Sequence, residues 1–208
     1  MGVDLSLFDK KKKNESIKKK YGIKGPFLLT VGRLAEKKGI KYLIGAMPTV
    51  LKEFPMTKLM IIGDGPEKPS LEELTEKLNL KNNIIFTGKI QNKLLPEYYA
   101  TADIFIGPSI VTKSGDTEGL GVVFLEALAS STAVIGSNVG GIPDIIKSNE
   151  TGLLIEQKNI KELSSAIIKL LKDKKLREIL AKNGQQHVKN NYDWSIIVDK
   201  FDTVIKNI

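Results

Sequence analysis

Six short apolar runs recur along the chain, and stretches of helical periodicity separate them. None of the runs alternates apolar with polar residues, which is typical of strands buried on both faces of a sheet. The alternation of apolar runs with helical stretches predicts an α/β fold: a Rossmann-like, doubly wound parallel sheet of about six strands with helices on both faces. Beyond Gly152 the pattern becomes helical, so we expect a helical C-terminal part. The runs lie at residues 27–31, 58–62, 83–86, 103–106, 132–135 and 152–155.

The absence of cysteine narrows the possible chemistry. A chain of 208 residues without cysteine has no disulfide, no thiolate nucleophile and no cysteine-ligated zinc, which suits a reducing compartment. No apolar run approaches the roughly 20 residues that a membrane-spanning helix needs. With a single histidine, a hydrolytic triad cannot be assembled either. These features predict a cytoplasmic protein.

Much of the net charge of +8 lies at the amino terminus, where residues 1–24 carry eight lysines against three acids. Such a segment can bind nucleic acid or anionic lipid. No aromatic residues interleave with the lysines to stack on bases, so we expect no nucleic-acid partner. We interpret the segment as solvated and partly mobile.

Glycines and charged residues follow the first four apolar runs. In parallel α/β sheets, ligands bind beyond the carboxyl ends of the strands. Each glycine alone is consistent with a plain turn, but their shared edge predicts that four strand ends face one crevice. The fourth run leads into a long loop, residues 107–121, that ends at a helix. The residues after the first three runs are Gly32, Arg33, Lys38, Gly63, Gly65, Gly88, Lys89 and Ile90.

The junction at residues 119–121 has the properties of an anion site. Free backbone N–H groups and the positive end of a helix dipole bind anions, and glycines allow a phosphate to approach closely. Arg33 and Lys38 add two cations, so a diphosphate fits better than a single phosphate.

Two glutamates flank this junction in the stretch "EGLGVVFLEALA". Glu118 repels phosphate and is better suited to accept hydrogen bonds from sugar hydroxyls beside a diphosphate. Glu126 is placed to accept the paired hydroxyls of a ribose. A spacing of this kind also arises by chance, and only the surrounding glycines and cations favour the ligand interpretation.

The chain resembles the carboxyl-terminal, donor-binding half of GT-B glycosyltransferases, specifically the retaining group 1 enzymes of glycosyltransferase family 4. "GVDLSLF" resembles the interdomain crossover of that family, and "EGLGVVFLEALA" resembles its signature of two glutamates. Four further segments also match: "VGRLAEKKGI", "IIGDGP", "FTGKI" and "SNVGGIPDII". Their combination is far more specific than any one of them.

The resemblance implies roles for individual residues. Arg33, Lys38 and Glu118 would be catalytic: the two cations would neutralise the departing diphosphate, and Glu118 would bind the hydroxyls of the donor sugar. Backbone amides at the helix start would hold the distal phosphate, and Glu126 the ribose. The implied donor-binding residues are Gly32, Gly63, Gly65, Lys89, Ile90, Gly119, Leu120, Gly121, Val122 and Glu126.

The resemblance also implies a division of the chain. Residues 1–24 would form the interdomain crossover and basic lead-in, and residues 25–208 the donor-binding domain. The amino-terminal acceptor domain would be absent, so we expect a fragment that is inactive alone. His187 would then be structural or exposed. Phe201 and Val204 would lie on an exposed apolar patch that allows dimerisation.

The expected function is therefore sugar transfer from a nucleoside diphosphate sugar to a glycan or lipid-linked acceptor in cell-surface polysaccharide synthesis. Gln91 and Asn92 stand where some guanine-reading relatives have an aspartate, which favours UDP over GDP. No D-x-D pair occurs, so we expect neither a metal nor another cofactor. Peripheral association of the full-length enzyme with the inner face of the membrane stays open. A nucleotide-sugar epimerase half and a non-catalytic nucleotide-binding module are the alternatives.

Overall fold

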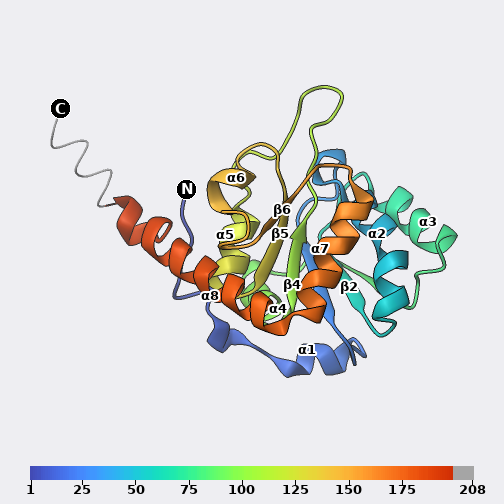
Figure 1. The fold of residues 1–208 in the computed structure, drawn as a ribbon, viewed down its shortest axis with the longest axis horizontal. Coiled ribbons are helices and arrows are strands. Elements are labelled where there is room, and N and C mark those ends of the chain that lie inside the picture. The colour runs from blue at the N-terminus through green and yellow to red at the C-terminus, as the bar shows by residue number, and fades with distance from the viewer. Residues whose placement is uncertain (199–208) are drawn as a thin grey trace.

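The sheet organises the molecule. In the computed structural model, which describes residues 1–198, six parallel strands pair in the order β3-β2-β1-β4-β5-β6 (Figure 1). The predicted doubly wound α/β fold is therefore confirmed, and each strand lies within two residues of its predicted run. The strands are β1 (Phe27–Val31), β2 (Lys58–Ile62), β3 (Ile84–Gly88), β4 (Ile104–Gly107), β5 (Ala133–Ser137) and β6 (Leu153–Ile155).

Both faces of the sheet are covered by helices, which explains why the strand sequences do not alternate apolar with polar residues. Side chains alternate between the faces, so Leu28 packs into one core while Phe27 and Leu29 pack into the other. The first core lies under α2 (Ile40–Glu53), α3 (Lys68–Lys77) and α7 (Ile160–Lys172). The second lies under α1 (Glu15–Lys20), α4 (Leu95–Thr101), α5 (Val122–Ala129) and α6 (Ile142–Ile145).

The C-terminal part is helical, as predicted. After β6 the chain forms α7 and then α8 (Lys174–Asn191), which runs along α5 and β5 (Figure 1). No helix within residues 1–198 is long and apolar enough to cross a lipid bilayer. The predicted exposure of Phe201 and Val204, and the dimerisation inferred from it, fall outside the described residues.

The basic amino-terminal segment packs against the domain. Val3, Phe8 and Ile17 are buried in the second core. The backbone N–H of Asn14 donates to Thr101 Oγ1 (2.9 Å), and Asn14 Nδ2 donates to Glu97 Oε2 (2.6 Å). The expectation of a solvated, partly mobile segment is thus wrong for its apolar residues. They add to the core, while most of the lysines stay exposed and Lys18 is partly buried.

Candidate functional site

The strand order reverses between β1 and β4, because the chain passes from β3 back across the sheet to β4. Ligands of open α/β sheets bind at such a reversal, beyond the carboxyl ends of the strands. The backbone is crowded there: a Cβ on Gly63 would collide with the carbonyl oxygen of Gly32. Gly63 also has a φ of 139°, so only glycine fits this position without strain. Two strand-end loops can therefore run in direct contact.

An open cavity of about 630 Å³ lies beyond β1, β2 and β3. The exposed Arg33 stands at its border. The volume of this cavity falls in the range of small-molecule sites. The structure therefore gathers around one space six of the eight residues named after the first three predicted strands, whereas Lys38 and the end of the fourth strand line a separate cleft. The lining residues are Val31, Gly32, Arg33, Ile62, Gly63, Asp64, Gly65, Lys89, Ile90, Asn92 and Leu95.

Lys38 and Glu118 form an ion pair beside this cavity. The Lys38 ammonium donates to Glu118 Oε2, and both side chains are largely buried, at 18% and 13% exposed. Ser109 Oγ lies 3.5 Å from the same carboxylate oxygen. Together with Gly32, the pair lines a small cleft between the ends of β1 and β4. The sequence assigned Lys38 to a diphosphate and Glu118 to a sugar, and the structure joins the two side chains.

The long loop after β4 is held against the segment that carries Lys38. The backbone N–H of Ile110 donates to the carbonyl oxygen of Lys37 (2.8 Å), and Lys37 Nζ lies 3.1 Å from Asp116 Oδ1. Lys38 itself belongs to the 3-10 helix η2 (Glu36–Lys38), which precedes α2. Glu118 is therefore positioned by contacts between segments about 80 residues apart.

The start of α5 offers backbone donors. Within residues 1–198, the N–H groups of Leu120, Gly121 and Val122 donate to no protein acceptor. The loop after β5 is hydrogen-bonded to the residues just before α5, because the N–H of Gly141 donates to the carbonyl oxygen of Gly119 (2.8 Å). These donors and the helix dipole form the surroundings that an anion requires.

Glu126 lies in the second turn of α5 and is half-buried. The hydroxyl of the fully buried Tyr99 donates to Glu126 Oε2 (2.7 Å). Burial raises the pKa of the Glu126 carboxyl, and the hydrogen bond from Tyr99 opposes that rise. Burial beside this carboxylate in turn raises the pKa of Tyr99. Among the described residues, Glu126 lines neither of the two cavities.

Sequence reasoning missed several residues near the site. Tyr99 is one of them, since no local sequence pattern links it to Glu126. Asp64 and Ser109 follow strand ends, which was a usable signal. His187 packs edge-on against Tyr192, and burial lowers the pKa of its imidazole. Within residues 1–198, no three His, Asp or Glu side chains are placed to hold a metal ion.

The chain is similar in sequence to a family of known enzymes. The family model of glycosyl transferases group 1 matches residues 13–187. The chain is 31% identical, over 96% of its length and 52% of the relative, to the GDP-mannose-dependent alpha-(1-6)-phosphatidylinositol monomannoside mannosyltransferase of Mycobacterium tuberculosis. It therefore spans about half the length of that enzyme.

Solved structures share the fold of this chain. The C-terminal domain of a glycosyl transferase group 1 family protein from Francisella tularensis superimposes with a TM-score of 0.81 at 30% identity, covering 93% of this chain and 100% of that domain. The Anabaena protein HepE, solved in complex with UDP, shares the fold with a TM-score of 0.87 at 21% identity, over all of this chain and 56% of HepE. The chain described here belongs to the glycosyl transferases group 1, and it corresponds to a C-terminal domain of that family.

Proposed function

We propose that the chain binds a nucleoside diphosphate sugar and forms the donor half of a retaining glycosyltransferase. The observation that carries this proposal is the Lys38–Glu118 pair, which lies beside the cavity where the strand order reverses. A cation and a carboxylate at one cleft match a ligand that combines a diphosphate with a polyhydroxyl sugar. The whole enzyme would transfer the sugar to a glycan or lipid-linked acceptor in cell-surface polysaccharide synthesis.

The mechanism is electrostatic. When the bond between the sugar and the diphosphate breaks, negative charge develops on the departing phosphate. Arg33 at the cavity border, Lys38 and the unused N–H groups of Leu120, Gly121 and Val122 stabilise that charge. Glu118 accepts hydrogen bonds from the sugar hydroxyls and keeps the Lys38 ammonium in place before the donor arrives. Neither step requires a metal ion or other cofactor.

We also propose which nucleotide base the donor carries. Gln91 and Asn92 favour UDP, and Asn92 lines the cavity. The Mycobacterium tuberculosis relative is named as GDP-mannose-dependent, which favours GDP. Calorimetric titration with UDP, GDP, ADP and their hexose conjugates, with and without EDTA, distinguishes these bases and tests for a metal requirement.

The substitution Glu118→Gln tests the roles within the pair. Removing the carboxylate frees Lys38, so we expect the affinity for the nucleoside diphosphate to rise. The additional affinity conferred by the sugar should fall by about tenfold, because hydrogen bonds from hydroxyls to a charged acceptor are lost. Asp116→Asn is the matched control, since Asp116 is an exposed carboxylate on the same loop.

Equal loss of affinity for nucleotide and nucleotide sugar in Glu118→Gln would contradict these roles. An unchanged affinity for both would favour the non-catalytic module. Conversion of the sugar without an acceptor by the full-length enzyme would favour the epimerase.

A further inference from the structure

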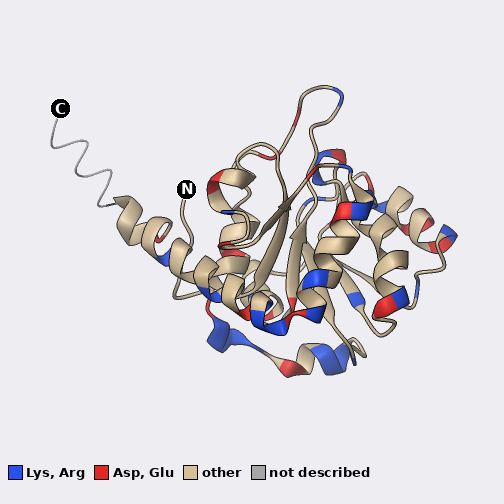
Figure 2. Ribbon diagram, in the orientation of Figure 1, with Lys and Arg blue, Asp and Glu red and all other residues tan. Residues whose placement is uncertain are grey.

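A groove lined by basic side chains lies at the amino ends of the strands, whereas the donor cavity lies beyond their carboxyl ends. It has a volume of about 480 Å³, and it is bordered by Asp103 and Ala133 at the beginnings of β4 and β5. Figure 2 shows Lys and Arg gathered along the 3-10 helix η1 (Lys10–Lys12), along α1 and at the start of α8. We call this space the basic groove. Its charged lining residues are Lys10, Lys13, Lys18, Lys174 and Arg177, with Asp103 and Glu178 as the carboxylates.

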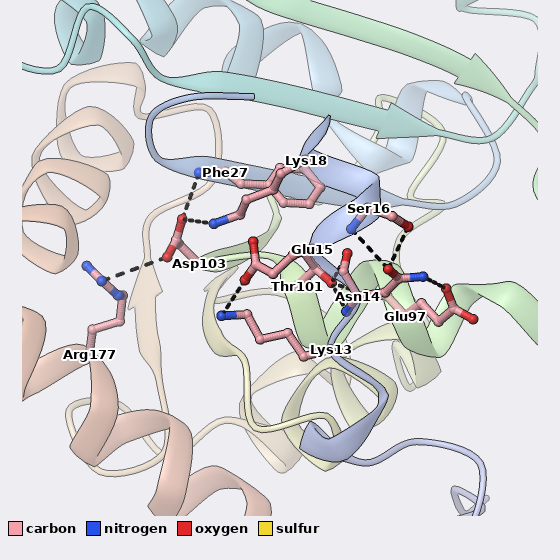
Figure 3. Close-up of polar contacts among 10 residues, drawn as sticks. All are labelled: Lys13, Asn14, Glu15, Ser16, Lys18, Phe27, Glu97, Thr101, Asp103 and Arg177. Carbon is pink, nitrogen blue, oxygen red and sulfur yellow. Dashed lines mark hydrogen bonds and ion pairs between the residues drawn. The ribbon is translucent and has the colours of Figure 1, made fainter. Parts of the chain in front are cut away.

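Asp103 lies between two of these cations (Figure 3). Asp103 Oδ2 accepts a hydrogen bond from the backbone N–H of Phe27 (2.8 Å). Lys18 Nζ lies 3.9 Å from Oδ2, and Arg177 Nη2 lies 3.9 Å from Oδ1. Both separations exceed the range of an N–H···O hydrogen bond. The carboxylate therefore holds the two cations near each other without using their hydrogen-bond donors.

Nη2 of Arg177 and the ammonium of Lys18 have no hydrogen-bond acceptor in the described part of the chain. Arg177 uses Nη1 to donate to the carbonyl oxygen of Leu170 (2.6 Å), which fixes the guanidinium while Nη2 makes no hydrogen bond. The ammonium of Lys18 makes no hydrogen bond within residues 1–198. Both side chains are mostly buried, at 23% and 17% exposed, so their positive charge is only partly solvated. Partly buried donors of this kind bind an anion more strongly than fully exposed ones.

The start of α8 adds positive potential. Its first turn contains Lys174 and Lys175 and no acidic residue, although Asp173 caps the helix. Cations near a helix amino terminus are unfavourable, because the dipole already places partial positive charge there. Violations of local rules of this kind are expected at functional or strained sites.

The remaining ion pairs do not neutralise the groove. Lys13 lies 2.7 Å from Glu15, and Lys174 lies 3.7 Å from Glu178. All four side chains are at least half exposed, and exposed pairs of this kind contribute little. Five cations therefore face two carboxylates in the lining.

We propose that the basic groove binds the phosphoryl group of an anionic ligand, at a site separate from the donor cavity. The guanidinium of Arg177 and the ammonium of Lys18 supply charge-assisted hydrogen bonds to phosphate oxygens, and Lys174 and Lys10 supply further charge. The volume admits a whole phosphorylated molecule or lipid headgroup around that phosphate.

Titration of the ¹⁵N-labelled protein with inorganic phosphate, monitored by NMR, tests this proposal. We expect saturable shifts of amides near Lys18, Asp103 and Arg177, and the same shifts in the presence of excess UDP. The double substitution Lys18→Gln/Lys174→Gln should weaken phosphate binding by about tenfold. Lys52→Gln/Lys77→Gln is the matched control, because it removes equal charge from exposed positions on α2 and α3.

Cosedimentation with phosphatidylglycerol vesicles, compared with phosphatidylcholine vesicles, identifies the source of the phosphate. Binding that depends on Lys18 and Lys174 assigns the groove to a lipid headgroup, whereas a response to free phosphate alone assigns it to a soluble ligand. The proposal is wrong if neither probe produces a response at the groove. It is equally wrong if the control variant loses as much binding as the groove variant, since the effect would then be one of net charge only.

Discussion

Glu126 and Tyr99 share a hydrogen bond inside the second core, next to the predicted donor site. The carboxyl group of Glu126 is half-buried in α5. Burial makes its ionised form costly in free energy, and this cost raises its pKa. The hydroxyl of Tyr99 offsets part of that cost. We propose that Glu126 binds the ribose of the donor, as the sequence predicts, and that Tyr99 holds its carboxylate in position.

Substitution of Tyr99 by phenylalanine should lower the free energy of unfolding by about 2 kcal/mol, because a hydrogen bond to a charged, partly buried acceptor is lost. Urea denaturation measures this change. Tyr98→Phe is the control: the hydroxyls of Tyr98 and Tyr21 are 3.5 Å apart, so we expect a change within about 0.5 kcal/mol. A Tyr99→Phe variant as stable as this control would contradict the importance of the contact.

Glu126→Gln should change stability and binding in opposite directions. The pKa of Glu126 is raised above its usual 4.5, so its protonated form contributes stability that is present below about pH 4.5. That stability is lost as the pH rises through the raised pKa. Glutamine does not ionise, so the variant should equal or exceed the parent in Tm at neutral pH. Its affinity for UDP or GDP should fall by about tenfold.

Thermal unfolding from pH 4 to pH 8, combined with calorimetry, tests both effects. The parent should lose stability relative to the variant as the pH rises. An identical pH dependence for the two proteins would show that Glu126 does not titrate in this range. Unchanged nucleotide affinity would remove Glu126 from the proposed donor site.

At the scale of elements, the start of α5 depends on the loop that follows β5. Gly140 has a φ of 54°, and a Cβ there would collide with the carbonyl oxygen of Glu118. The neighbouring Gly141 donates to Gly119. The position of Glu118 therefore depends on two adjacent glycines, in addition to the ion pair with Lys38.

Gly140→Ala should displace the backbone at Glu118 and weaken binding of the nucleotide sugar by more than tenfold, while the strands remain folded. Gly115→Ala provides a close control, since Gly115 also has a positive φ, 84°, but a Cβ there meets nothing within 4 Å. Both substitutions carry backbone strain of roughly 1–2 kcal/mol. Calorimetry and circular dichroism on both variants separate the displacement from that strain, and equal losses of affinity would contradict the steric account.

At the scale of the whole molecule, the amino-terminal segment packs into the core of the domain, so we expect the two to unfold together. Phe8 packs edge-on against Tyr99, with ring centroids 5.9 Å apart. Tyr99 also contacts Phe105 of β4. A continuous row of buried aromatic rings therefore joins the segment to the centre of the sheet.

Phe8→Ala should lower the free energy of unfolding by about 3 kcal/mol, because it leaves a cavity beside Tyr99. The adjacent Leu7→Ala, at a side chain 36% exposed, should change it by less than about 1 kcal/mol. Urea unfolding should show a single transition in both variants. A separate early transition assigned to residues 1–24 would show that the segment folds independently.

The fold could be predicted from the sequence because its determinants are local. Each strand is a short apolar run bounded mostly by glycine or polar residues. Because such strands are buried on both faces, the run can be recognised without an alternation of apolar and polar residues. Gly32, Gly63 and Lys89 could be assigned to strand ends for the same reason, and in the folded sheet these strand ends lie beside one cavity. The sequence by itself therefore determined the sheet, its layers and the edge at which a ligand is expected.

Which side chains meet depends on the three-dimensional fold. Lys38 and Glu118 are 80 residues apart, Tyr99 and Glu126 are 27 apart, and Phe27 and Asp103 are 76 apart. No local pattern specifies these pairs, because they depend on the strand order and on the direction of each side chain. The basic segment shows the same limit: charge indicated a solvated surface, whereas packing of Val3, Phe8 and Ile17 placed the lysines at a groove.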